Sequence, residues 1–306
     1  MPELPDIEAY VKALSLRLPG KPCLGLRLAS PFLLRTVDPP PEELAGTRIR
    51  RLFRLGKRIV TEFDGELFLS LHLMISGRLR WEGPRARVPG RIGLAALDTE
   101  EGTLLITEAA TKKRASLHLV RGVKGIKALD PGGIEVLEAP LDIFRAHLVR
   151  ENHTLKRSLT DPRIFSGIGN AYSDEILHHA RLSPFRQTRQ MDDTEIERLW
   201  NSIRTVLESW RDRLVAEAAG EFPRHVTAFR EGMSVHGRYR KPCPDCGAPV
   251  QRIVYAENES NYCARCQTAG RLLADRSLSR LLKGDWPRTL EELEEGRRRQ
   301  EPGGSV

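Results

Sequence analysis

Residues 57–73 read KRIVTEFDGELFLSLHL, two segments of alternating side-chain character separated by Asp64-Gly65. Alternation sends successive side chains to opposite faces of a strand, and Asp-Gly between two such segments signals a turn. In 67–73 the leucines share one face, which leaves Phe68, Ser70 and His72 on the other. The stretch therefore predicts two β-strands joined by a turn.

Similar segments surround this pair between about Cys23 and Val120. They read CLGLRLAS, TRIRRLFRL, RIGLAALD, TLLITE and ASLHLV. Several short strands at this spacing predict a β-sandwich. Before them, apolar residues recur every three to four positions from Ile7 to Leu18, where Pro19-Gly20 stops a predicted helix. We therefore predict an N-terminal domain over residues 1–125, made of a helix and a β-sandwich.

Helical periodicity returns near Leu141 and defines a predicted helical domain over residues 136–225. Its longest helix is predicted to begin at Thr194-Glu195-Ile196-Glu197, a capping-box pattern. The apolar side chains that follow, from Ile196 to Leu214, are predicted to face the core. The predicted fold is therefore α+β with several domains.

Four of the five cysteines lie near the C-terminus as Cys243-x2-Cys246 and Cys263-x2-Cys266. Two such pairs supply four thiolates and predict a closed tetrahedral zinc site, one structural Zn2+ with no open position for catalysis. A redox dithiol needs only one pair. We predict a zinc-finger β-hairpin over residues 234–267, in which basic neighbours present Arg and Lys to DNA, followed by a charged tail over 268–306 that is helical or frayed.

The 306 residues carry 49 Lys and Arg against 41 Asp and Glu, which gives a net charge of +8 and a pI near 9.4. A basic balance favours a polyanionic partner, chiefly nucleic acid. No apolar run approaches the roughly 18 residues of a membrane span, and acidic residues near the start argue against a targeting peptide. We expect an intracellular monomer that does not bind membranes.

A glycine turn, Gly167-Ile168-Gly169-Asn170, precedes a predicted helix. Such a turn offers backbone N–H groups to a phosphate, although a plain turn between packed helices is the commoner arrangement. At the start of the chain, removal of Met1 would leave Pro2 with the free amine. An amine of ordinary pKa near 8 is partly unprotonated at neutral pH and nucleophilic, and Glu3 beside it suits acid–base work.

These features together resemble formamidopyrimidine-DNA glycosylase/endonuclease VIII. The resemblance covers residues 1 to about 267, in the family's order. It rests on MPELPDIEAY, RLGKRIV around Lys57, LHLMISGRLR around His72, SGIGNAYSDEIL and the four-cysteine hairpin.

The resemblance implies a catalytic β-sandwich, a helix–two-turns–helix domain and a zinc finger that together bind damaged double-stranded DNA. It implies base excision with AP lyase activity: Pro2 attacks C1′ of an everted nucleotide, Glu3 protonates the sugar ring oxygen, and β- and δ-elimination cut the strand. The matching positions assign a catalytic role to Lys57 and phosphate contacts to His72, along with Lys156 and Asn170.

The sequence departs from the family's pattern at three places. Ile75 stands where the family's gap-filling methionine lies, and Lys112 and Arg114 occupy the positions of its companion arginine and phenylalanine. Asn258 stands at the place of the zinc-hairpin arginine and is the predicted DNA contact there, with Arg252 and Arg265 as alternatives for that role.

Two other functions compete with the enzyme. One is a catalytically weakened, damage-binding member of the same family, which the changed residues favour. The other is a zinc-ribbon transcription factor, which has no reason to keep Pro2, Glu3 and Lys57 together. The opening PELP resembles the formamidopyrimidine branch, but residues 221–240 lack the string that precedes its 8-oxoguanine-covering loop. We therefore expect ring-opened bases and abasic sites to be better substrates than 8-oxoguanine.

Overall fold

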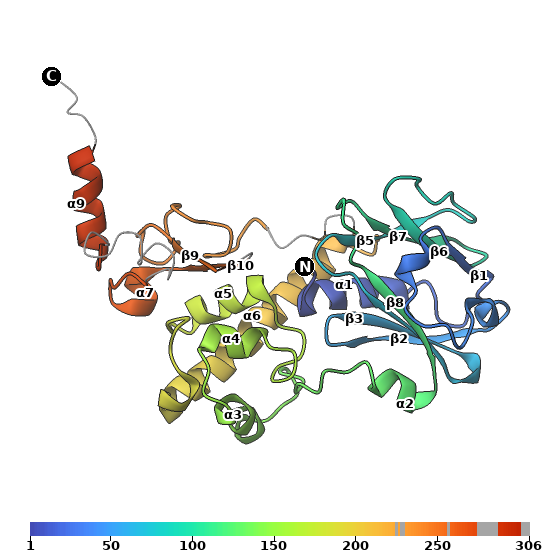
Figure 1. Ribbon diagram of the computed structural model, residues 1–306, viewed down its shortest axis with the longest axis horizontal. Coiled ribbons are helices and arrows are strands. Elements are labelled where there is room, and N and C mark those ends of the chain that lie inside the picture. Colours follow the sequence, from blue (N-terminus) through green and yellow to red (C-terminus); the bar gives the residue numbers. More distant parts are fainter. Residues whose placement is uncertain (224–225, 227–229, 256–257, 274–286, 301–306) are drawn as a thin grey trace. The chain divides into compact units, whose positions relative to one another are not determined.

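The computed structural model describes residues 1–223, 226, 230–255, 258–273 and 287–300. The chain divides into two compact units (Figure 1). The first contains residues 1–136, 161–168 and 207–228, and the second contains 137–160, 169–206 and 229–306. No helix among the described residues is both long and apolar enough to cross a membrane.

The first unit opens with helix α1, Leu4–Ser15, as the apolar periodicity predicts. Glu3 is the N-cap, and Glu3 and Asp6 form a capping box in which the Glu3 backbone N–H donates to Asp6 Oδ2 at 2.9 Å. The helix packs on strands β2 and β3 and buries Ile7, Tyr10 and Leu14 completely.

Two four-stranded antiparallel sheets form the predicted sandwich (Figure 1). One sheet has the order β2-β3-β4-β8, with β2 Ile49–Leu55, β3 Arg58–Phe63, β4 Leu67–His72 and β8 Ser116–Arg121. The other has the order β1-β6-β7-β5, with β1 Gly25–Leu28, β6 Gly93–Asp98, β7 Thr103–Glu108 and β5 Gly77–Glu82. Strand β5 was not among the predicted strands, although its sequence GRLRWE alternates and carries its charges at half-buried and exposed positions.

The outer face of the β2-β3-β4-β8 sheet is less exposed than a simple sandwich implies. The leucines of β4 enter the sandwich core, but Phe68 and Ser70 on the opposite face are 4% and 0% exposed. Helix α2, Gly122–Lys127, covers part of that face, where Ile126 packs with Phe68 and Val60. The sandwich core therefore buries one face of β4, and the short helix covers part of the other.

The second unit is helical as far as residue 206. Its helices are α3 Leu141–Val149, α4 Leu155–Thr160, α5 Asn170–His179 and the first half of α6, Asp193–Ala218. The predicted start of α6 needs a correction, because the capping box uses Asp192 and not Thr194. The Glu195 N–H donates to Asp192 Oδ1 at 2.8 Å, and the Asp192 N–H donates to Glu195 Oε2 at 3.2 Å.

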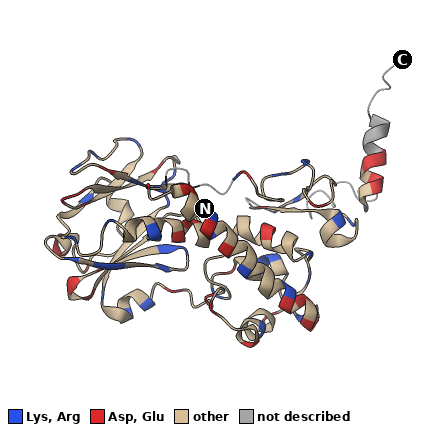
Figure 2. Ribbon diagram, turned by 180° about the vertical axis from the view of Figure 1, so that it is seen from behind, with Lys and Arg blue, Asp and Glu red and all other residues tan. Residues whose placement is uncertain are grey.

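The C-terminal part of this unit is the predicted hairpin with its flanking helices. Strands β9, Gln251–Tyr255, and β10, Asn258–Tyr262, pair antiparallel and lead into α7, Ala264–Thr268. The tail contains helix α9, Leu290–Gln300, whose first residue is buried against the hairpin's core. Lys and Arg are interspersed with Asp and Glu over the described elements, and acidic residues gather at the start of α9 (Figure 2). Short 3-10 turns lie at 31–33, 41–44, 64–66 and 188–190.

Candidate active site and zinc centre

The chain's amino terminus lies in a largely dry, charged environment. Pro2 and Glu3 are buried, and the Glu3 side chain is 2% exposed. Burial lowers the pKa of the Met1 amine below its ordinary value; Glu3 opposes this effect, whereas Arg78 and Lys57 add to it. The amine, a carboxylate and two cations therefore act on one another within the first unit.

Gly167 holds the start of α1 in place. The Leu4 backbone N–H donates to the Gly167 carbonyl at 2.9 Å. Gly167 has φ +83°, and a Cβ there would lie 2.9 Å from Leu4 Cβ, closer than packed carbon atoms approach. Gly167 therefore supports the start of α1, directly after Pro2 and Glu3, and a phosphate contact by this turn stays a prediction.

Arg54, which was not singled out in the sequence, joins α1 to the turn between β2 and β3. Its side chain is 9% exposed. The guanidinium donates to Glu8 Oε1 at 2.8 Å, forms an ion pair with Glu135 and donates to the Gly56 carbonyl at 3.0 Å. Burial alone would lower the pKa of Arg54, but the hydrogen bonds to both carboxylates raise it. This network braces the turn in front of Lys57.

Lys57 and Arg78 are the cations that act on the amine. Burial lowers the pKa of Lys57, and the charge of Glu3 opposes that shift. Arg78, also missed in the sequence, donates to the carbonyls of Ile75 and Gly77 at 3.1 and 2.7 Å. Arg78 therefore connects the surroundings of the amine to the loop that carries Ile75.

His72 ends β4 and is half-buried. Its Nδ1 accepts the Met74 backbone N–H at 3.1 Å, which leaves the proton on Nε2. Burial, followed by the charges of Arg58 and Lys57, lowers the pKa of His72 to about 4. His72 is therefore a neutral hydrogen-bond donor at pH 7, and its phosphate contact stays a prediction.

The three positions that depart from the family's gap-filling pattern lie on neighbouring loops. Gly77 at the start of β5 pairs with Glu108 at the end of β7, so the loops on either side of this pair are adjacent. Ile75 is 53% exposed, and Lys112 and Arg114 are exposed. Glu108 Oε2 accepts the backbone N–H of Arg114 at 2.9 Å and so shapes the basic loop.

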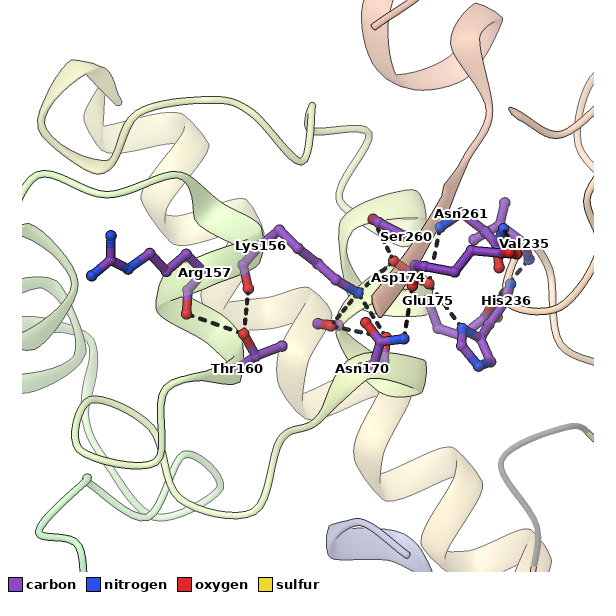
Figure 3. Close-up of polar contacts among 12 residues, drawn as sticks. Lys156, Arg157, Thr160, Asn170, Asp174, Glu175, Val235, His236, Ser260 and Asn261 are labelled. Atoms are coloured by element: carbon purple, nitrogen blue, oxygen red, sulfur yellow. Dashed lines mark hydrogen bonds and ion pairs between the residues drawn. The ribbon is translucent and has the colours of Figure 1, made fainter. Parts of the chain in front are cut away.

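The Lys156 ammonium forms three hydrogen bonds within the second unit. Its Nζ donates to the Asn170 carbonyl at 2.7 Å, Ser173 Oγ at 2.8 Å and Asp174 Oδ1 at 2.6 Å (Figure 3). An ammonium has three protons, so its donors are used inside the protein. Lys156 therefore positions the start of α5 in this structure, and its phosphate contact stays a prediction.

Asn170 and two buried acids connect α5 to the zinc hairpin (Figure 3). Asn170 Nδ2 donates to the Glu259 carbonyl at 2.7 Å, which uses one of its two amide protons. Asp174 accepts from Ser260 Oγ at 2.9 Å and from the Asn261 N–H at 3.1 Å. Burial raises the pKa of Glu175, although its carboxylate accepts three backbone N–H groups from residues 234–236.

The four predicted cysteines form one cluster with the dimensions of a zinc site. Their Sγ atoms all lie within 4.8 Å of one another, with Cys243–Cys266 at 3.9 Å and Cys246–Cys263 at 3.4 Å. Zinc–sulfur bonds of about 2.3 Å in a tetrahedron require sulfur atoms about 3.8 Å apart. The residues present therefore fit Zn2+, which a set of four thiolates encloses without a catalytic position.

His178 on α5 adds a contact to this centre that the sequence does not reveal. Its Nε2 lies 3.3 Å from Cys243 Sγ, and the side chain is 4% exposed. A histidine N–H donated to a zinc-bound thiolate orients the ligand. Asn258, the predicted hairpin contact, begins β10, but its side chain lies outside the described residues.

Three family models match the chain and together span most of it. The formamidopyrimidine-DNA glycosylase N-terminal domain matches residues 1–119, the H2TH domain of the same glycosylase matches 133–210, and a zinc finger found in FPG and IleRS matches 240–269. The zinc finger contains all four clustered cysteines.

Curated relatives and solved structures agree with these matches. A formamidopyrimidine-DNA glycosylase from Heliobacterium modesticaldum is 32% identical over 284 residues, which is 87% of this chain and all of that protein. A formamidopyrimidine-DNA glycosylase-like protein from Mycobacterium tuberculosis is 37% identical over 151 residues, 49% of this chain and 94% of its own length. The Lactococcus lactis FPG (MutM) in complex with FAPY-dG-containing DNA has a TM-score of 0.77 at 24% identity, covering 87% of this chain and 100% of that one. The match confirms the predicted fold.

Proposed function

Because the chain belongs to the formamidopyrimidine-DNA glycosylase family, we propose that Pro2, freed by removal of Met1, is its nucleophile. Members of this family are base-excision-repair DNA glycosylases, and AP lyase activity is typical of them. We propose damaged double-stranded DNA as the partner, a monomer as the active form, and a location with the cell's DNA.

The observation that carries this proposal is the environment of the amino terminus. A buried amine with a lowered pKa is more often unprotonated at neutral pH, and only the unprotonated amine attacks carbon. Removal of Met1 transfers the amine one residue along the chain, toward the buried Glu3 carboxyl group. Arg78 and Lys57 oppose protonation of the Met1 amine, and we propose that they favour the nucleophilic form of the Pro2 amine in the same way.

In the proposed reaction the Pro2 nitrogen bonds to C1′ as the bond to the damaged base breaks. Glu3 protonates the sugar ring oxygen, the ring opens, and the amine and C1′ form an iminium. Successive elimination of the 3′ and 5′ phosphates then cuts the strand on both sides of the sugar. Lys57 is proposed to assist base release from its place beside Glu3, and the zinc centre takes no chemical part.

Borohydride trapping on a duplex with an abasic site tests this mechanism. Protein with a free Pro2 amine, verified by mass spectrometry, should form a covalent adduct, and protein with an intact N-terminal tag should form none and lose both activities. Glu3→Gln should lose base release and retain much of its DNA binding.

An adduct formed by the intact tagged protein would exclude Pro2 as the nucleophile. DNA binding by the free-amine protein without any adduct would instead favour the weakened, damage-binding member of the family. The exposed Ile75 and its basic neighbours, which replace the family's gap-filling residues, are the observation behind that second function.

A further inference from the structure

A polar cluster lies on the outer face of the β2-β3-β4-β8 sheet, next to His72. Arg58 on β3 pairs with His72 on β4, and Ser70 on β4 pairs with His118 on β8. Directly opposed residues share a face, and their Cβ atoms are about 5 Å apart. We call Arg58, Ser70 and His118 the outer-face cluster.

Each member of the outer-face cluster has a buried polar atom without a hydrogen-bond partner among the described residues: Arg58 Nη1, Ser70 Oγ and His118 Nδ1. Ser70 is 0% exposed, whereas Arg58 and His118 are half-buried and so reach the surface. An unsatisfied buried polar group costs about 1–3 kcal/mol, and more when it is charged. The three atoms themselves are buried, so only the exposed parts of Arg58 and His118 can contact a partner from outside.

The charge around the cluster indicates what kind of partner is absent. Within the part of the chain that the structure describes, no carboxylate forms an ion pair with Arg58. Burial lowers the pKa of His118, and the charges of Arg58 and Arg35 lower it further. By contrast, Arg51 on the same face is already neutralised by Glu62 at 2.5 Å. The cluster is therefore a positive patch without a counter-ion.

We propose that Arg58 and His118, the two members of the outer-face cluster that reach the surface, bind one phosphodiester of the DNA backbone, beyond the position of His72. The proposal rests on the proposed function, since DNA is the anion that this enzyme would meet. A guanidinium and a neutral imidazole each donate a hydrogen bond, and a phosphodiester offers only acceptors. A backbone contact of this kind adds affinity without sequence preference.

The salt dependence of DNA binding tests the subsite. Each neutralised phosphate contributes about 0.9 to the slope of log K against log salt. With a duplex that carries a tetrahydrofuran abasic analogue, Arg58→Gln should reduce the magnitude of the negative slope by about one, and Arg58→Lys should retain it. Arg51→Gln, which removes an equal charge from the same face, should leave the slope unchanged. His118→Leu should weaken binding without changing the slope.

An unchanged slope in folded Arg58→Gln protein, or an equal decrease in Arg51→Gln, overturns the proposal. Binding of inorganic phosphate to the protein, compared with chloride at equal ionic strength, shows whether the site holds the free anion instead of the DNA backbone. Phosphate binding that depends on Arg58, together with an unchanged DNA slope, would also overturn it. Because the analogue is bound without reaction, a missing borohydride adduct in unmodified protein contradicts the proposed function and leaves this test intact.

Discussion

Gly167→Ala, compared with a control glycine, should separate the cost of the backbone conformation from the effect of displacing the amino terminus. Gly167→Ala places a Cβ at φ +83° and 2.9 Å from Leu4 Cβ. The left-handed backbone costs an L-residue about 1–2 kcal/mol, and overpacking adds about 1–3 kcal/mol. Because α1 must move away from the turn to relieve the contact, the hydrogen bond from Leu4 N–H to the Gly167 carbonyl weakens. Pro2 and Glu3 then shift with the start of the helix.

Gly132→Ala is the matched control. Gly132 has φ +90°, with nothing within 4 Å of the added Cβ, so it carries the backbone cost alone. Urea unfolding should give a loss of about 1–2 kcal/mol for Gly132→Ala and about 2–5 kcal/mol for Gly167→Ala.

The kinetic consequence is measured by single-turnover borohydride trapping at saturating abasic DNA. A displacement of about 1 Å at reacting atoms costs up to about 100-fold in rate. We expect Gly167→Ala to react at least tenfold more slowly and Gly132→Ala to match the unmodified protein. Equal stability losses in the two variants, together with equal rates, would refute the assignment of Gly167 as the support for the amino terminus.

Four further outcomes are expected. Cys243→Ser should release zinc, as metal analysis would show, and weaken DNA binding, whereas Cys23→Ala, a core position whose burial raises its thiol pKa to about 11, should retain the metal. His178→Phe keeps the volume and loses the contact to Cys243, so chelator competition should find zinc affinity reduced about 10- to 100-fold; unchanged affinity would contradict that contact. Below about pH 6.5 the unfolded His72 takes up a proton that the folded residue accepts only near pH 4. The free energy of unfolding should therefore fall as the pH drops from about 6.5 to 4, and this group contributes at most about 3 kcal/mol to the decrease. In His72→Asn this part of the pH dependence, followed by urea unfolding, should disappear. With Ile75 in place of the usual wedge, single-turnover rates on matched duplexes should be higher for abasic sites and formamidopyrimidines than for 8-oxoguanine opposite cytosine, and the reverse order would reject that preference.

Local patterns account for the features that the sequence alone determined. The alternation in 57–73 predicts β3 and β4 because side-chain direction in a strand depends only on position along it. The two C-x2-C pairs predict the zinc site because each turn brings its own two thiolates together. The presence of helix α1 follows from a helical period, which is also a property of neighbouring residues.

Features that depend on residues far apart in the chain were decided only by the tertiary structure. Lys156 has the position of a phosphate ligand in the sequence, but its protons are used by Asn170, Ser173 and Asp174, 14 to 18 residues away. Gly167 has a turn-forming sequence, yet its closest constraint is Leu4, near the start of the chain. A side chain's type limits what it can bind, and only packing decides which of its donors remain available.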